Sequence, residues 1–351
     1  MKVAVIGGGI AGCAAAALLA EDGADVTLYE RAEIAAGASG RNSGLLQHPM
    51  DEPLVPVYEA SLGLYATLGH GFELPAEPAG TLVVSHDGEA LAPDAAAAAR
   101  FPELRPVWLE GRALTAEEPA LADGLYGYRL HTGLPVPPAA ATRAWAERAR
   151  AAGATIATGV EATVARGEGV LAGGERRPAE AVVVAAGPWT PEALGAPGWR
   201  PVGPLWGVVA QVTLARPPRH AIEQAGVKAL TDPAASQDSL FSIVTVDGGS
   251  SVGSTFTTAE PDPAEVAPRL LERGARYVPA LAGARIEGVR ACARPRSVDG
   301  RPLLGPIGDG VCLLTGHGPW GVSLGPGSAR LVADVVLGRP TDIPPELAAT
   351  R

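Results

Sequence analysis

The first thirty residues contain the pattern that most restricts how this chain can fold. Residues 2–6 are short, apolar and β-branched, as in a buried strand, and Gly-Gly-Gly-Ile-Ala-Gly follows at positions 7–12. Residues 11–21 then predict a helix of small side chains, and residues 26–30 predict a second strand. A strand–helix–strand unit with so short a crossover favours parallel strands. We therefore expect an α/β fold with a Rossmann-type layer.

The glycines match the pattern G-x-G-x-x-G through Gly7, Gly9 and Gly12. The first glycine permits a tight turn, the second lets backbone N–H groups approach a pyrophosphate, and the third allows close packing of helix and strand. The helix N-terminus adds a partial positive charge at Ile10 and Ala11. Glu30 ends the second strand, where an acid binds a ribose 2′-OH. In this context the motif predicts dinucleotide binding.

Composition excludes several other classes of protein. The chain has 351 residues and a net charge of −10, which argues against a nucleic-acid partner. Its three cysteines are too few and too scattered for a disulfide framework, and no His/Cys cluster has the spacing of a metal site. We find neither a signal peptide nor an apolar run long enough to span a membrane, so we expect a cytoplasmic protein. Arginine far outnumbers lysine, which indicates a bacterial source with a GC-rich genome.

Two kinds of segment alternate along the chain. Strand and helix patterns of the parallel type occupy residues 1–73, 137–198 and 288–351, which we assign to one discontinuous nucleotide-binding domain. Short alternating strands separated by prolines occupy residues 74–136 and 199–287, which predicts a mainly antiparallel β-sheet domain that binds the substrate.

Several segments resemble the D-amino-acid oxidase, glycine oxidase and sarcosine oxidase superfamily of FAD-dependent oxidoreductases. They are the loop at residues 35–44, the pair Arg294-Pro295, residues 299–306 and the glycine-rich run at 316–326. The resemblance extends over nearly the whole chain. It implies FAD as the cofactor, bound by a Rossmann-type domain of the glutathione-reductase kind that is interleaved with the antiparallel domain.

The resemblance also implies further FAD contacts. In the superfamily, the loop after the second strand wraps the pyrophosphate and flavin, a later strand pair lies near the adenine, and the last glycine loop opens a helix that faces the flavin. Besides the residues of the glycine motif, the expected contacts are Arg31, Ser39, Arg41, Asn42, Ser43, Gly44, Leu45, Val160, Ala186, Gly187, Trp189, Gly318, Trp320, Gly321, Val322 and Ser323.

Three residues are candidates for the chemistry. By the resemblance Arg294 would hold a substrate carboxylate, which a guanidinium does through two parallel hydrogen bonds, although an arginine paired to an acid would look the same in sequence. His48 follows the expected flavin contacts Gly44 and Leu45, and His317 lies between two glycines of the last glycine loop, although a lone histidine is more often structural. Arg290 and Arg296 are expected to be surface or structural residues.

Cys292 stands where sarcosine oxidases carry a cysteine bonded to the flavin, and a buried free cysteine is the alternative. The oxygen-activating lysine of sarcosine oxidases has no counterpart at residues 250–253, and Lys228 is the one interior lysine.

The sequence therefore predicts FAD-dependent oxidation of a primary or secondary amine, in particular an amino acid. Flavin N5 would accept a hydride, the imine would be hydrolysed, and oxygen or another acceptor would take up the electrons. A 2-hydroxy-acid dehydrogenase and a non-catalytic, flavin-bound accessory subunit remain alternatives. Whether the chain forms a homo-oligomer stays open.

Overall fold

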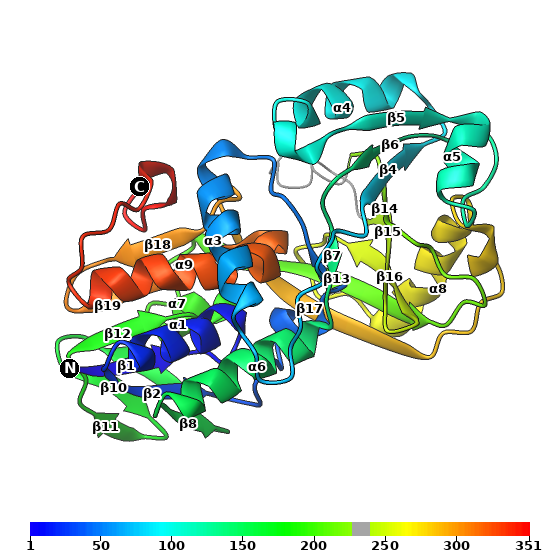
Figure 1. Cartoon of the computed structure of the whole chain (residues 1–351). Coiled ribbons are helices and arrows are strands. Elements are labelled where there is room, and N and C mark those ends of the chain that lie inside the picture. Colours follow the sequence, from blue (N-terminus) through cyan, green and yellow to red (C-terminus); the bar gives the residue numbers. More distant parts are fainter. Residues whose placement is uncertain (227–238) are drawn as a thin grey trace.

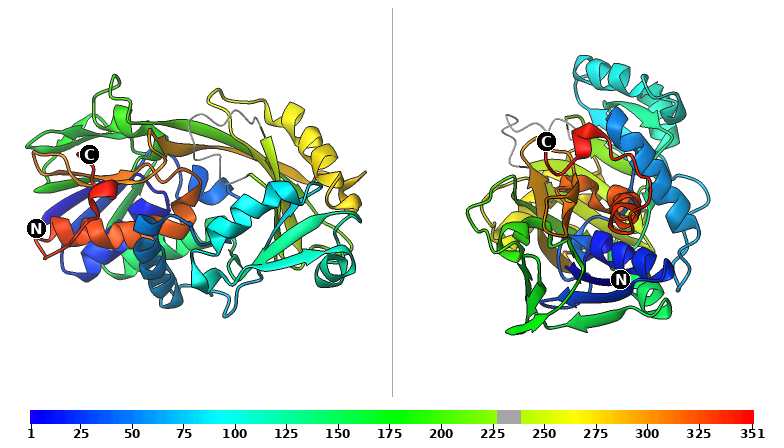
Figure 2. Two further views of the ribbon diagram at one scale, coloured as in Figure 1. Left: turned by 90° about the horizontal axis from the view of Figure 1, so that it is seen from above. Right: turned by 90° about the vertical axis from the view of Figure 1, so that its left-hand side faces the viewer.

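The computed structural model describes residues 1–226 and 239–351, so Lys228 lies outside the described residues. Within these residues the chain forms one six-stranded and one eight-stranded sheet, with smaller two- and three-stranded sheets beside them. The two large sheets lie next to each other along the long dimension of the molecule (Figures 1 and 2). The predicted α/β class, with a parallel and a mainly antiparallel sheet, is confirmed.

The six-stranded sheet contains the two strands predicted at the start of the chain. Its order is β18-β19-β12-β1-β2-β8, and its pairs are parallel except for β18 with β19. Side chains of alternate parity in β1 are buried on opposite faces, as expected for a strand covered on both sides. The strands are β1 (Lys2–Ile6), β2 (Asp25–Glu30), β8 (Thr155–Thr158), β12 (Ala181–Val184), β18 (Leu303–Pro306) and β19 (Val311–Thr315).

Helices cover one face of this sheet and a small sheet covers the other. Four helices pack over Val3, Val5 and Val183: α1 (Ile10–Glu21), α3 (Val55–Ala66), α6 (Pro138–Ala151) and α9 (Gly321–Val336). The opposite face is covered by an antiparallel meander that the sequence analysis did not anticipate. It consists of β9 (Ala162–Ala165), β10 (Gly169–Ala172) and β11 (Glu175–Arg177).

The eight-stranded sheet has the order β17-β13-β16-β15-β14-β4-β6-β5 and is antiparallel except where β14 pairs with β4. One face packs on α5 (Gly111–Glu117) and α8 (Pro263–Ala275), and part of the other packs on α4 (Ala92–Ala98). The strands are β4 (Thr81–Ser85), β5 (Val107–Glu110), β6 (Tyr126–Leu130), β13 (Val202–Val212), β14 (Ala221–Gln224), β15 (Ser239–Val246), β16 (Gly249–Thr255) and β17 (Gly288–Ser297).

Strand β17 brings the two sheets together. It is the edge strand of the larger sheet, where it pairs with β13, and on its other side Arg296 forms one isolated bridge with His317. Beyond its free edge lie α2 (Ala38–Arg41) and two short 3₁₀ turns, Gly187–Trp189 and Gly318–Trp320, which follow strands of the six-stranded sheet. A short pair, β3 (Leu45–Leu46) with β7 (Leu134–Pro135), adds a second connection. The carboxyl ends of β1, β12 and β19 therefore face β17, where a ligand of such a sheet binds.

Candidate active site

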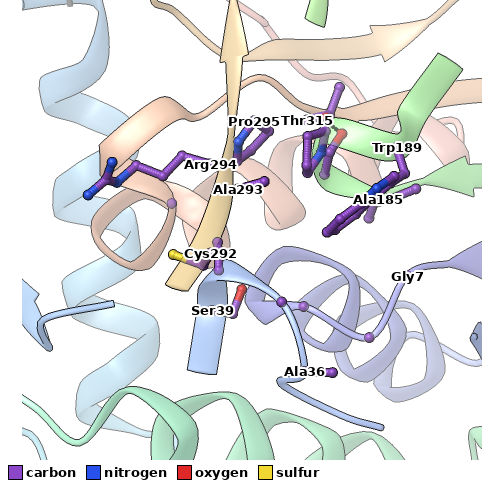
Figure 3. A pocket seen from close by; sticks show the side chains of 18 of the residues that line it. Gly7, Ala36, Ser39, Ala185, Trp189, Cys292, Ala293, Arg294, Pro295 and Thr315 are labelled. Atoms are coloured by element: carbon purple, nitrogen blue, oxygen red, sulfur yellow. Dashed lines mark hydrogen bonds between the residues drawn. The ribbon is translucent and has the colours of Figure 1, made fainter. Parts of the chain in front are cut away.

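A cavity of about 700 Å³ lies between β17 and the carboxyl ends of the parallel strands. Its walls are the glycine turn after β1, the end of β2, the loop with α2, the turns after β12 and β19, and both sides of β17. Figure 3 shows Gly7, Ala36 and Ser39 on one side, and Trp189, Thr315 and the side chains of β17 on the other. This volume is in the usual range for a small-molecule or cofactor site.

The glycine turn is built by contacts that exclude any side chain. Gly7 has φ +115°, and a Cβ there would overlap the carbonyl oxygen of Ala185. A Cβ on Gly12 would overlap the carbonyl oxygen of Gly7, so the helix can pack this closely only with glycine. Helix α1 begins at Ile10, whose N–H donates to Ser39 Oγ at 2.9 Å. These contacts give the first and third glycines the roles that their spacing predicts.

Glu30 is fixed at the wall of the cavity. One carboxylate oxygen accepts a hydrogen bond from the backbone N–H of Gly8 (2.6 Å), and the other accepts from Ala32 (2.8 Å). Beside it the Arg31 guanidinium lies 4.1 Å from the centre of the Trp189 ring, and both residues line the cavity. The donors of the turn and this acid fit the pyrophosphate and ribose of a dinucleotide.

The loop after β2 is held in shape by Asn42. Its Oδ1 accepts from Gly44 N–H at 2.8 Å, and its Nδ2 donates to the carbonyl oxygens of Ala38 and Ser39, each at 3.0 Å. Gly44 has φ +81°, and a Cβ there would overlap the carbonyl oxygen of Val136. Because Arg41 also donates to the carbonyl oxygen of Ala291 at 3.3 Å, the loop is tied to β17 across the cavity.

Arg294 extends from β17 over the eight-stranded sheet, named the substrate sheet. Its guanidinium donates to Ser254 Oγ (2.6 Å) and to the carbonyl oxygen of Thr255 (3.0 Å), and it lies 4.7 Å from the centre of the Phe256 ring. It covers Gly207, where a Cβ would overlap the guanidinium. Burial lowers the pKa of Arg294 below its ordinary value. No carboxylate of the described residues pairs with this cation, so its charge is available to an anionic ligand.

Cys292 points to the same side of β17 as Arg294, whereas Ala293 and Pro295 point to the other (Figure 3). Burial raises the pKa of its thiol, and the positive charges of Arg294, Arg41 and Arg290 act in the opposite direction. The side chain lines the cavity, where it can contact a bound cofactor.

Arg290, predicted from the sequence to be a surface or structural residue, joins three segments. It donates to Gln211 Oε1 (3.1 Å), to Ser251 Oγ (2.7 Å) and to the carbonyl oxygen of Asn42 (3.3 Å). The larger sheet is thereby attached to the loop after β2.

The two candidate histidines occupy different environments. His48 is buried outside the lining of the cavity: its Nε2 lies 3.0 Å from Glu103, and its Nδ1 accepts from Met50 N–H at 3.2 Å. His317 lines the cavity with its Nε2 3.0 Å from Ser328 Oγ. Burial lowers the pKa of His317 to about 4, so this imidazole is neutral near pH 7.

The cavity brings together most of the residues predicted to bind the cofactor. It omits Gly12, Ser43, Gly44, Leu45, Val160, Trp320 and Ser323 from its lining. Gly12 and Gly44 act through the backbone packing described above, and residues 161–163 line the wall in place of Val160. Val289 and Ala291 on β17 also line the cavity, and the sequence did not indicate them because no local pattern marks the free edge of a strand.

A glycine turn with an acid at the end of the next strand, joined to an antiparallel sheet that presents a buried cation, is typical of dinucleotide-dependent flavoproteins with two sheets. The family model described as FAD dependent oxidoreductase (DAO) matches residues 2–335, and the chain belongs to this family.

Solved structures agree with this assignment. Glycine oxidase from Geobacillus kaustophilus is 25% identical, with a TM-score of 0.87 over 100% of this chain and 99% of that one. Iminodiacetate oxidase from Chelativorans sp. BNC1 is also 25% identical, with a TM-score of 0.80 over 99% and 98% of the two chains. Among curated proteins, one of Schizosaccharomyces pombe whose name suggests an oxidoreductase is 37% identical over 49 residues, which are 14% of this chain and 13% of that protein.

No group of three or more His, Cys, Asp or Glu residues in the described part of the chain could hold a metal ion. None of its helices combines the length and apolarity needed to cross a membrane.

Proposed function

We propose that this protein oxidises an amine, in particular an amino acid, with FAD bound in the cavity between the two sheets. The observation that carries the proposal is the buried Arg294 guanidinium, whose hydrogen-bond partners among the described residues are the neutral oxygens of Ser254 and Thr255. A carboxylate is the anion that suits such a planar pair of donors. The similar glycine oxidase and iminodiacetate oxidase are named for substrates that carry both an amine and a carboxylate.

The cofactor-binding residues fit FAD. The glycine turn and Ser39 would hold the pyrophosphate, Glu30 the ribose, and Arg31 with Trp189 would cover the adenosine end of the cavity. Bound FAD supplies the acceptor for the hydride that leaves the substrate carbon.

The residues of the chain contribute orientation and a dry environment. Arg294 would hold the carboxylate so that the adjacent C–H bond points to the cofactor, which supplies part of the rate enhancement through positioning. His317 is neutral and hydrogen-bonded to Ser328, so we assign it no proton transfer near pH 7. Water then hydrolyses the imine product to a keto acid or aldehyde, with release of ammonia or an amine.

The test is anaerobic titration of the purified holoenzyme with D-, L- and N-methyl amino acids and with 2-hydroxy acids. Loss of the oxidised flavin band together with release of ammonia or amine supports the proposal, whereas reduction by 2-hydroxy acids alone contradicts it. In the Arg294→Ala variant we expect kcat/KM to fall about 100-fold or more, because two charge-assisted hydrogen bonds contribute about 1.5–3 kcal/mol each. Arg294→Lys keeps the charge without the paired donors and should recover part of this loss. Wild-type kcat/KM in Arg294→Ala would refute the assignment of this residue.

A further inference from the structure

The substrate sheet contains a buried carboxylate that the proposed reaction does not use. Glu223 on β14 is only 5% exposed. Its Oε1 accepts a hydrogen bond from Gln47 Nε2 at 2.9 Å, and its Oε2 has no hydrogen-bond partner among the described residues. The buried hydroxyl of Tyr128, on the nearby strand β6, also has none. Leaving buried polar atoms unpaired costs free energy, so such atoms in a native fold require an explanation.

Strand register places Glu223 on the same face of the sheet as Arg290 and Arg294. Glu223 is in register with Ser242, Ser242 with Gly253, Gly253 with Val209, and Val209 with Arg290. Residues in register share a face, and Arg294 is four positions from Arg290 on the same strand. The opposite face is occupied by the core under α8. The Tyr128 hydroxyl lies on the same side, because Tyr128 pairs with Val83 and Val83 with Glu223.

Gln47 links Glu223 to the cofactor end of the molecule. Its backbone N–H donates to Ser323 Oγ (3.1 Å) in the first turn of α9, and residues 321 and 322 of that turn line the cavity. The lining of the cavity reaches Arg294, and Glu223 lies farther along the same face of the sheet.

The separation of the two charges suits a ligand that bridges them. The Arg294 guanidinium contacts Ser254 on β16, and Glu223 stands two strands away on β14. Because neighbouring strands are about 4.8 Å apart, this is about 10 Å across the sheet. The residues in register with Glu223 on the two strands towards Arg294 are Ser242 and Gly253. A Cβ on Gly253 would lie 3.5 Å from Ser242 Oγ. Small residues therefore form the floor between the two charged groups.

We propose that the substrate is an amino acid with a cationic side chain, whose carboxylate binds Arg294 and whose distal ammonium or guanidinium binds Glu223. The free oxygen of Glu223 and the oxygen of Tyr128 accept hydrogen bonds from the distal cation. A side chain of about three or four methylene groups bridges the gap. This inference rests on the proposed function and names the substrate class for the same site.

The protonation state of the Tyr128 hydroxyl is compatible with its role as a hydrogen-bond acceptor. Burial raises the pKa of its hydroxyl, and the negative charges of Asp94 and Glu223 raise it further. The group is therefore a neutral phenol near pH 7, with lone pairs available to an N–H donor.

The first experiment compares substrates that differ only in the distal charge. The wild-type holoenzyme is mixed anaerobically with both enantiomers of lysine and norleucine, and of ornithine and norvaline, and flavin reduction is followed. We expect the cationic member of a pair to have a kcat/KM about 10- to 100-fold above that of the neutral member. In Glu223→Gln this preference should disappear through loss of activity on the cationic substrates, because the amide has no charge but can still accept from Gln47. Glu272→Gln is the matched control, since Glu272 is an exposed carboxylate on α8 outside the cavity lining and should keep the preference.

The second experiment does not depend on turnover. Binding of δ-aminovalerate and valerate, which share a carboxylate and differ in the distal ammonium, is measured from thermal stabilisation of the holoenzyme. We expect the aminated ligand to bind about tenfold more tightly to the wild type, and the two to bind equally to Glu223→Gln. Tyr128→Phe, which retains the ring, should lower the ratio by several-fold and serves as the second variant if Glu223→Gln does not fold.

The results separate the two proposals. Reduction by neutral amino acids without a preference for cationic ones overturns the role of Glu223 and leaves the proposed function standing. Equal losses on both members of a pair in Glu223→Gln also overturn it. If no amino acid reduces the flavin, the proposed function fails, and the ratio of δ-aminovalerate to valerate binding still decides whether Glu223 recognises a cation.

Discussion

The two sides of the cavity are built in different ways. At the turn after β1, backbone contacts backbone: Gly7 lies against Ala185, and Gly12 against Gly7. At the substrate sheet, side chains reach across strands, as Arg294 does from β17 to β16 and Arg290 does from β17 to β13, β16 and Asn42. The first arrangement tolerates no change of shape, because a peptide group in a packed sheet cannot move aside. The second can adjust, since a long side chain has other rotamers.

The largest effect is expected at the first of these sites. In Gly12→Ala the added methyl group overlaps the Gly7 carbonyl, so α1 must move away from β1 and its N-terminus leaves the pyrophosphate position. We expect the purified variant to retain less than about a tenth of the wild-type FAD content, measured from the ratio of flavin to protein absorbance after gel filtration.

The control for this prediction is Gly63→Ala. Gly63 lies inside α3 and has nothing near its Cβ position, so alanine there should leave FAD content unchanged and favour the helix by about 0.5–1 kcal/mol. Full FAD content in Gly12→Ala would show that the turn is less rigid than the backbone contacts indicate.

Gly207, on the substrate side of the cavity, provides the comparison with Gly12. The three atoms nearest to a Cβ on Gly207 all belong to the guanidinium of Arg294, which is the far end of a flexible side chain. We expect Gly207→Ala to fold and to keep its FAD, while the displaced Arg294 binds the carboxylate poorly. The kcat/KM for amino acids should fall about 10- to 100-fold, mainly through KM, because one or two charged hydrogen bonds are lost. Steady-state kinetics on the reconstituted holoenzyme measures this fall.

Gly203→Ala is the control on the same strand. Gly203 also lies on β13 but has no atom near its Cβ position, so its substitution should not alter kcat/KM. If Gly207→Ala lost its FAD as Gly12→Ala is expected to do, the contrast between the two sides of the cavity would be wrong.

The same contrast explains what the sequence could predict. Gly7, Gly12 and Glu30 lie within one strand–helix–strand unit, so their spacing alone indicates how they meet. Arg294 was found through a resemblance, and the neutral partners that leave its charge unpaired come from β16, a remote segment. The three partners of Arg290 and the link from Gln47 to Glu223 depend on strand register between distant segments, which no local pattern encodes. His48 follows the loop at residues 35–44 in sequence, yet its ring packs against Tyr58 and Phe101.

His317 lies where the two sides meet, and it gives the smallest effect near pH 7. Its folded pKa is about 4, below the ordinary value of 6.5, because burial disfavours the charged imidazolium. The unfolded chain therefore binds a proton at a higher pH than the native chain does. The contribution of neutral His317 to the free energy of unfolding is therefore fully present above pH 6.5 and decreases as the pH falls towards 4. The expected total decrease is about 3 kcal/mol.

In His317→Gln, which can still reach Ser328, the acid-dependent part of this loss should disappear. The free energy of unfolding, measured by chemical denaturation across this pH range, should fall less steeply in the variant than in the wild type. His86→Gln removes an exposed histidine and should follow the wild-type curve. Because His317 is neutral above pH 6.5, the variant should also leave the pH profile of flavin reduction unchanged there. A shift of that profile would show that His317 titrates during the reaction and takes part in proton transfer.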